Sequence, residues 1–344
     1  MKAKPRTLLS FLCALLFLIA TTQASGQNPT PSSSPSQLTP EEKALLAEAV
    51  ALSRRIVELH GARKFDEALP LARRAIELRR RVLGQGSALV AESISNLGAL
   101  YVAKDDYERA GTEFRTALQI YENRGVPTQN MGYVLDTLAL LRWRVGDFDK
   151  AEAYAKKAME IKEKVHGEQT PQFLESVNNL VKIYDSAGKS SQRNALLLRV
   201  IAVLETAKDT LNDRQSLIRY YCSLRQGKQT PEIEAMTRRI EALLKWEPAK
   251  PSPMSVGVLN GRAISLPRPP YPYEARTAHE SGTVVVEVEI DECGNVASAK
   301  AVSGPGVLRK VCESAAKAAR FTPTIIDGTP IRVMGVIQYH FVAQ

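Results

Sequence analysis

Two hydrophobic patterns succeed one another along the chain. From about residue 41 to residue 246, apolar residues recur every three or four positions, which is the period of helices with one buried face. From Val284 to Ile290 the pattern changes to strict alternation, with an apolar residue at every second position. Alternation of this kind is typical of an antiparallel strand that is buried on one face. The chain is therefore predicted to be a multidomain protein, with an all-α region followed by a small α+β domain.

The helical region repeats itself. Two alanines recur at the same place in three successive segments, 42 and then 41 residues apart: Ala68, Ala110 and Ala151 for the first, and Ala75, Ala117 and Ala158 for the second. Small residues at fixed positions let two antiparallel helices cross closely. The pattern resembles tetratricopeptide repeats, and its long period resembles the kinesin-light-chain-like variety. The resemblance implies a helical solenoid over residues 41–246.

Such solenoids bind peptides or partner domains along the first helix of each repeat. The groove candidates are polar residues on these helices: Asn96, Tyr133, Asn178 and Asn179. Packing between helices is the alternative explanation for them. The segment 173–206 departs from the pattern, because Arg193 stands where the other units have alanine, and this predicts a weaker helix crossing. Segments 211–226 and 231–246 are predicted to form a last helix pair that caps the stack.

The sequence pattern of residues 265–344 predicts a small domain whose elements follow in the order strand, strand, helix, strand. The letters "DECGN" supply a turn after the alternating strand, with Gly294 suited to positive φ, and a second strand follows over residues 296–302. A helix comes next, because five apolar residues fall on one stripe: Leu308, Val311, Cys312, Ala315 and Ala319. A last strand is predicted over residues 331–342.

Short motifs occur in a fixed order across the same region: Tyr271-Pro272, Gly282, Asp291 with Gly294-Asn295-Val296, Ser303-Gly304, Phe321 with Pro323, and Gly335 with Tyr339 and Phe341. Together they resemble the C-terminal domain of the TonB family. The resemblance implies a periplasmic domain that contacts outer-membrane receptors, with the final strand as an exposed edge that pairs with a receptor peptide. The partner-binding candidates are Tyr271, Pro272, Met334, Val336, Gln338 and His340. A dimer interface or a helix contact on that strand is the alternative.

The first 26 residues are predicted to be a cleavable signal peptide, because a basic start precedes an apolar run from Leu8 to Ala20 and small residues follow. That run is short for a helix that spans a bilayer. The alternative is that the run stays as an inner-membrane anchor. Residues 27–40, rich in proline and serine, are predicted to be a disordered linker, and residues 247–264 a proline-rich linker.

The charge pattern of the chain bears on its possible partners, and its cysteine content bears on its disulfide bonds. The formal net charge is +9, but the basic residues form no stripe with interleaved aromatic residues, so no nucleic-acid partner is predicted. Without the leader three cysteines are left, Cys222, Cys293 and Cys312, which allows one bridge and one free thiol, or no bridge. Cys312 is predicted to fill the core, and a Cys293–Cys312 bridge is the alternative.

The sequence contains no catalytic constellation. Its four histidines lie far apart, without a carboxylate or cysteine at ligand spacing, and no nucleophile or phosphate-binding motif occurs. We therefore predict a protein that is not an enzyme and needs no cofactor or metal. The leading hypothesis is a periplasmic adaptor with protein partners. The alternatives are an inner-membrane-anchored energy transducer of the TonB type and a structural envelope protein that dimerises through its C-terminal domain.

Overall fold

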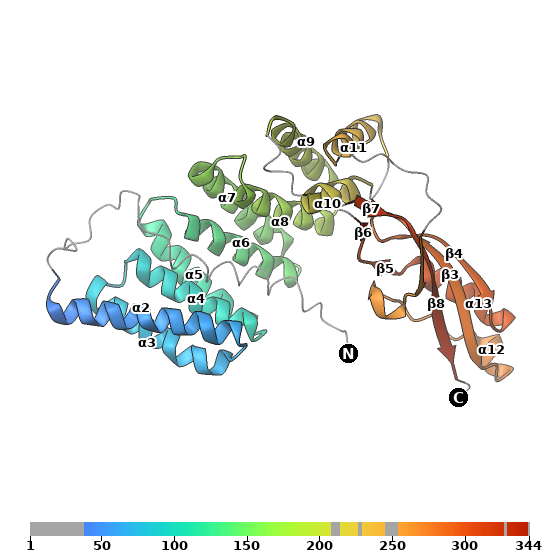
Figure 1. Cartoon of the computed structure of the whole chain (residues 1–344), viewed down its shortest axis with the longest axis horizontal. Coiled ribbons are helices and arrows are strands. Elements are labelled where there is room, and N and C mark those ends of the chain that lie inside the picture. Colours follow the sequence, from blue (N-terminus) through green and yellow to red (C-terminus); the bar gives the residue numbers. More distant parts are fainter. Residues whose placement is uncertain (1–37, 208–213, 226–228, 245–253, 327–328, 343–344) are drawn as a thin grey trace. The chain divides into compact units, whose positions relative to one another are not determined.

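The computed structural model describes residues 38–207, 214–225, 229–244, 254–326 and 329–342. The predicted signal peptide and residues 27–37 of the predicted linker lie outside the described residues. The described part begins with helices that pack in consecutive pairs (Figure 1). Their bounds are α2 Pro40–Gly61, α3 Phe65–Leu83, α4 Ala88–Ala103, α5 Tyr107–Asn123, α6 Gln129–Arg144, α7 Phe148–His166, α8 Pro171–Ala187, α9 Ser190–Thr206, α10 Arg214–Arg225 and α11 Pro231–Leu244.

The helices begin where local sequence signals place them. Thr39 caps α2: its hydroxyl accepts a hydrogen bond from the Glu42 N–H at 3.2 Å, and the Glu42 carboxylate accepts one from the Thr39 N–H at 2.8 Å. Asp106, Asp147 and Thr170 cap later helices in the same way, each accepting from the backbone N–H three residues on. These caps satisfy N–H groups that have no partner inside the helix.

The repeated small residues lie where helices cross. Ala68, Ala110 and Ala151 are fully buried. At Gly98 on α4 an added Cβ would lie 3.0 Å from the ring of Phe114 on α5, so a larger residue would require that ring to shift. The small-residue pattern therefore marks close helix packing, as predicted.

Arg193 shows how the departing repeat is accommodated. Its side chain is buried, and its guanidinium lies 2.9 Å from the carboxylate of Asp185 at the end of the preceding helix. A partly buried ion pair thus takes the place of the small residue. None of the described helices combines the length and apolar character needed to cross a membrane.

The chain divides into two compact units, one ending at Leu196 and the other beginning at Leu197. The second unit contains α10, α11 and a strand-rich C-terminal region. The predicted last helix pair is confirmed, because α10 packs against α11. The multidomain order of helices followed by a small α+β region is confirmed as well, whereas the exact domain boundaries stay a prediction.

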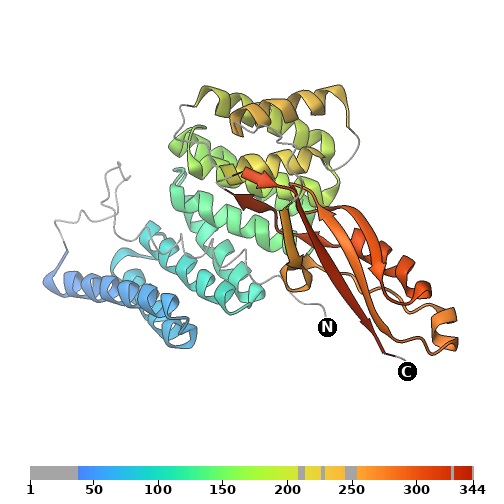
Figure 2. The ribbon, with the colours of Figure 1, turned by 45° about the vertical axis from the view of Figure 1, so that its right-hand side comes forward.

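The C-terminal region is built on a four-stranded sheet with the order β1-β8-β3-β4 (Figure 2). β8 runs antiparallel to β3, from the pair Gly282↔Phe341 to the pair Ile290↔Val333, and β3 pairs with β4 in the same sense. The predicted strand, strand, helix, strand order is thus present, and β1 is an addition to it. The bounds are β1 Met254–Val258, β3 Gly282–Ile290, β4 Val296–Ser303, α13 Gly306–Lys317 and β8 Val333–Phe341.

Helix α13 packs on one face of this sheet and closes a small core. Leu308 and Cys312 from the helix meet Val284, Val286 and Ile337 from the strands, and all are buried. Cys312 is free and fills the core, as predicted, and burial raises the pKa of its thiol to about 11. Short elements complete the region: η4 Asn260–Arg262, β2 Ala263–Ser265, α12 Tyr273–Thr277, β5 Arg320–Phe321, β6 Thr324–Ile326 and β7 Thr329–Ile331.

The predicted linker over residues 247–264 needs a correction. Residues 254–264 contain β1, η4 and most of β2, and β1 pairs with the last strand of the sheet. The nearby prolines suggested an extended tether, but an extended segment needs only free backbone groups beside it to become a strand. Residues 247–253 of the linker lie outside the described part of the chain.

The cysteines pair across two parts of the second unit. Cys222 on α10 forms a disulfide with Cys293 in the β3–β4 turn, with 5.4 Å between their Cα atoms and a sequence separation of 71. The alternative Cys293–Cys312 bridge is therefore wrong, because Cys312 lies in the core while Cys293 lies at the turn. The turn itself is as predicted: Gly294 has a φ of 80°, and Asp291 accepts hydrogen bonds from the N–H groups of Cys293 and Asn295.

Candidate protein-binding surfaces

The last strand, β8, carries most of the residues predicted to bind a partner. Its odd-numbered side chains, such as Val333 and Ile337, enter the core. Met334, Val336 and Gln338 lie on the opposite face and are half-buried, and His340 is exposed and bonds Thr283 at 2.8 Å. Because N–H and C=O groups alternate in direction along a strand, the backbone groups of these even-numbered residues point away from β3. We call them the β8 edge.

The prediction that this edge is exposed is wrong for the structure as it stands. β1 lies beside β8 in parallel orientation, with Met254 opposite Val333 and Val258 opposite Val336. The N–H of Leu259 donates to the carbonyl of Val336 at 2.9 Å. β8 is therefore an inner strand of the sheet, and the chain itself covers the edge that was expected to be free.

Asn260 extends this pairing with its side chain. Its amide oxygen accepts from the Gln338 N–H at 2.9 Å, and its amide nitrogen donates to the Gln338 carbonyl at 2.6 Å. The side chain thus makes the two bonds that a neighbouring strand would make. The fit is tight here, because a Cβ on Gly335 would lie 2.5 Å from the Leu259 side chain and 2.7 Å from the Gly257 carbonyl.

The opposite edge of the sheet, along β4, is protected by a side chain. The carboxylate of Glu313 on α13 accepts a hydrogen bond from the backbone N–H of Ala301 at 2.8 Å. A carboxylate on an edge N–H both satisfies that donor and places a negative charge against an incoming strand. The β8 edge is therefore covered by a strand of the chain, and the β4 edge by a side chain.

The Tyr271-Pro272 motif holds the turn that leads into the sheet. Pro272 precedes the first turn of α12, and the Tyr271 hydroxyl donates to the Glu280 carbonyl at 2.5 Å. The Tyr271 ring also packs against Phe341 at the end of β8, with 5.7 Å between ring centroids. Half-buried in these contacts, Tyr271 ties the start of the domain to the end of its last strand.

The groove candidates of the repeats divide into two groups. Asn96 and Asn178 are half-buried, whereas Tyr133 and Asn179 are buried. The buried pair belongs to a polar network around Lys162 on α7. The Lys162 ammonium lies 4.3 Å from the centroid of the Tyr133 ring, and the Asn179 amide donates to Asp136 at 3.0 Å.

Lys162 is the centre of that network. Its ammonium lies 2.6 Å from the Asp136 carboxylate and 2.7 Å from that of Glu175, and Asp136 also accepts from Ser176. Burial alone would lower the pKa of Lys162, but the two carboxylates outweigh it and hold that pKa above its ordinary value. Lys162 therefore stays charged, and the network joins α6, α7 and α8 from within.

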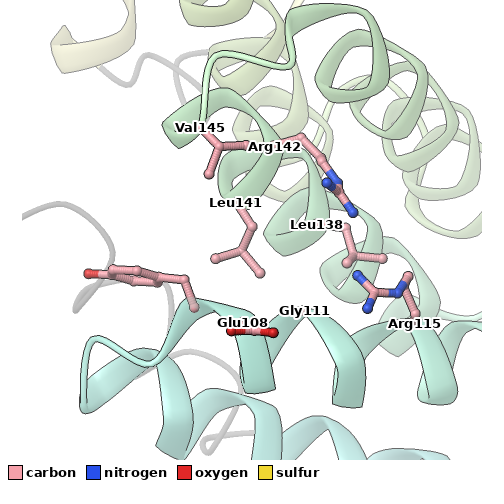
Figure 3. Close-up of a pocket in the computed structure, with 8 residues that line it drawn as sticks. Glu108, Gly111, Arg115, Leu138, Leu141, Arg142 and Val145 are labelled. Atoms are coloured by element: carbon pink, nitrogen blue, oxygen red, sulfur yellow. The ribbon is translucent and has the colours of Figure 1, made fainter.

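A pocket of about 340 Å³ opens between α5 and α6. In Figure 3, Leu138 and Leu141 point from α6 toward α5, and the guanidinium groups of Arg115 and Arg142 lie at the same end of the pocket. Its full lining is Tyr107, Glu108, Gly111, Arg115, Leu138, Leu141, Arg142 and Val145. An apolar floor beside two cations suits an apolar side chain next to a carboxylate.

Comparison with known proteins assigns both parts of the chain. Residues 267–343 match the Gram-negative bacterial TonB protein C-terminal family, and residues 46–123 and 133–172 match two tetratricopeptide repeat families. The chain combines tetratricopeptide repeats with a TonB C-terminal domain. Both resemblances predicted from the sequence are thereby confirmed. Both families consist of protein-interaction domains, and the TonB C-terminal family belongs to proteins of the Gram-negative cell envelope.

The repeats resemble kinesin light chains in particular. The chain is 25% identical over 183 residues to the Arabidopsis thaliana protein KINESIN LIGHT CHAIN-RELATED 2, a match that covers 53% of this chain and 25% of the plant protein. The chain thus spans about a quarter of the length of that relative. The crystal structure of BtubC (BKLC) from P. vanneervenii is 19% identical, with a TM-score of 0.50, and covers 72% of this chain and 96% of that one. This likeness confirms the tetratricopeptide-like solenoid fold.

Several residues at these surfaces were absent from the sequence-based prediction. The predicted linker over residues 247–264 contains three of them, Gly257, Leu259 and Asn260. The sequence signal for a strand there is a short apolar run, "SVGVL", between prolines and a polar turn. Lys162 carried no signal, since a lysine on an amphipathic helix is normally exposed. Among the described residues, no group of three or more His, Cys, Asp or Glu side chains is placed to hold a metal ion.

Proposed function

We propose that this protein is a periplasmic adaptor. Its repeats would bind one protein partner, and its C-terminal domain would bind an extended segment of an outer-membrane receptor or of another envelope protein. The family matches support protein binding by both parts and an envelope setting for the second. The predicted signal peptide, which would deliver the chain to the periplasm, supports the location.

The observation that carries this proposal is the pairing of β1 with the β8 edge. The extended segment β1 lies there in parallel orientation, and just beyond it the Leu259 N–H and the Asn260 side chain bond the backbone groups of Val336 and Gln338. Such backbone pairing is what strand addition requires, and it accepts many sequences because it uses few side chains. The β4 edge offers a poorer site, since Glu313 already occupies the Ala301 N–H.

The repeats offer a site of a different kind. The pocket between α5 and α6 combines Leu138 and Leu141 with the cationic groups of Arg115 and Arg142. The polar contacts of these two cations are long: Arg115 donates to Thr112 at 3.2 Å, and Arg142 lies 3.9 Å from Asp147. Both guanidinium groups can therefore reorient toward an acidic partner segment with an apolar side chain.

Photo-crosslinking in the native host tests the proposal. A photoreactive residue at Gln338 is expected to capture an envelope protein, and one at Arg115 a second protein. The control position is Lys317, an exposed residue of α13 that belongs to neither surface. Adducts at Gln338 and Arg115 that do not exceed those at Lys317 would exclude the adaptor role. The intact mass of the purified protein tests the location, because a chain that begins near Gln27 has lost its leader.

A further inference from the structure

β1 is held on the β8 edge by few side chains. Met254 and Val258 are 49% and 54% exposed, and Ser255 and Gly257 are exposed as well. Leu259, just after the strand, is buried in the core with 3% of its surface exposed, and Val256 is half-buried and packs against the same core. On the other side, β8 pairs with β3 over its whole length in unbroken register. The two neighbours of β8 thus differ greatly in how much apolar surface they bury.

The pairing of β1 is also irregular. Ser255 lies opposite Met334, but the next pair is Val258 opposite Val336, so two residues of β1 face one of β8. Gly257 lies in this bulge with a φ of 72°, a conformation that favours glycine. Its carbonyl would lie 2.7 Å from a Cβ on Gly335, so Gly335 leaves no space for a side chain. A Cβ on Gly257 itself would meet nothing within 4 Å, so glycine is favoured there by its φ and not by crowding.

The chain on the C-terminal side of β1 has its own attachment. After η4, Ala263 pairs with Phe321 and Ser265 with Arg320 as β2 joins β5. If residues 254–260 left the β8 edge, taking Leu259 and Asn260 with β1, β2 could stay in place, so their departure need not unfold the domain. The exposed edge would then present free backbone groups at Val336 and Gln338.

From these contacts we infer that β1 is an exchangeable occupant of the β8 edge, and that its sequence describes the segment that replaces it. That segment would be extended and parallel to β8, with glycine where it crosses Gly335. Two residues later it would carry a leucine-like side chain for the place of Leu259, followed by a side-chain amide for Gln338. The inference rests on the proposed strand-binding function and adds the chemistry of the partner.

A peptide of this chain's own sequence tests the inference. The probe is the labelled peptide MSVGVLNGR, which corresponds to residues 254–262, and binding to the full mature chain is measured by fluorescence anisotropy. The variant Asn260→Ala removes two hydrogen bonds of the resident strand, so the free edge becomes more populated. The peptide should then bind about tenfold more tightly than to the unchanged protein.

Two further variants keep the test decisive. Arg262→Ala, on an exposed side chain just beyond Asn260, should bind the peptide as the unchanged protein does. Gly335→Ala should bind it at least tenfold more weakly than Asn260→Ala, because the added methyl group obstructs any strand at this place. A control peptide carrying Gly257→Val should not bind. Hydrogen exchange at β3 verifies that each variant is folded.

The outcomes separate this inference from the proposed function. The inference is supported if the peptide binds Asn260→Ala more tightly than it binds the unchanged protein and Arg262→Ala. This holds even if no envelope protein is captured at Gln338 in the host. Equal binding to Asn260→Ala and Arg262→Ala would overturn it, since the resident strand would then not compete. The inference would also be overturned if the peptide did not bind Asn260→Ala although hydrogen exchange shows that β1 has left the edge. An envelope protein captured in the host would still support the adaptor role in both cases.

Discussion

The repeats and the C-terminal sheet leave different groups available for recognition. Helices satisfy nearly all of their backbone N–H and C=O groups internally, so the repeats can recognise a partner only through side chains such as Arg115 and Leu141. A sheet leaves backbone groups unpaired along its two edges. Recognition at the repeats therefore depends on sequence and shape, whereas recognition at the sheet edge depends on whether that edge is free.

The two regions also use buried polar groups differently. In the repeats, the Lys162 network lies among α6, α7 and α8 and contributes to the packing of the helices. In the C-terminal region, the half-buried side chains of Glu313 and Asn260 satisfy backbone groups of the strands β4 and β8. The comparison predicts that polar substitutions affect stability strongly in the repeats and affect accessibility in the sheet.

The largest effect should come from the centre of the repeat network. Lys162→Met removes the cation between Asp136 and Glu175 and leaves Asp136 fully buried with its charge uncompensated. The free energy of unfolding should fall by about 3–5 kcal/mol, measured by urea titration of the helical circular dichroism signal. Lys157→Met is the matched control on the same helix, because its pair with Glu122 is exposed and worth about 0–1 kcal/mol. Similar losses for both variants would contradict a structural role for the network.

The disulfide should have the next largest effect. Replacing both Cys222 and Cys293 with serine frees a loop of 71 residues in the unfolded state, so the second unit should lose about 2–4 kcal/mol. Thermal unfolding with and without reductant checks this, since reductant should lower the Tm of the unchanged protein but not that of the double variant. A Tm that is insensitive to reductant in both proteins would argue against the bridge.

Gly335→Ala should weaken the β1 side of the sheet without disturbing β3. The new methyl group would meet Gly257 and Leu259, so β1 must shift, at a cost of about 1–3 kcal/mol. Amide hydrogen exchange should become faster at Leu259 and stay slow at Val286. Gly261→Ala is the control, because a Cβ at that position meets nothing within 4 Å. Equal protection of Leu259 in both variants would mean that the close approach has no role.

The smallest effect is expected at the β4 edge. Glu313→Ala leaves the Ala301 N–H without its partner, and the loss should be about 0.5–1.5 kcal/mol because water can replace the carboxylate at an edge. Exchange of the Ala301 amide should become faster, whereas Lys317→Ala, at an exposed position on the same helix, should leave it unchanged. If Glu313→Ala instead exposes the whole sheet, the two edges are less independent than the structure implies.

Much of the fold follows from local chemistry that is visible in the sequence. The alternation from Val284 to Ile290 predicted a half-buried strand, and recurring small residues predicted close helix pairs, because these periods reflect which face is buried. The turn at Gly294 and the cap at Thr39 were predictable for the same reason, since each depends on a few adjacent residues.

Only the tertiary structure decided what lies beside the last strand and inside the repeats. β1 pairs with β8 across more than seventy residues of sequence, as the contact between Asn260 and Gln338, 78 residues apart, illustrates. Cys222 and Cys293 meet because α10 and the β3–β4 turn come together, which no spacing pattern records. Lys162 is buried because two carboxylates from other helices surround it. Periodicity reports the face of an element that is covered, whereas the identity of the covering group depends on long-range contacts.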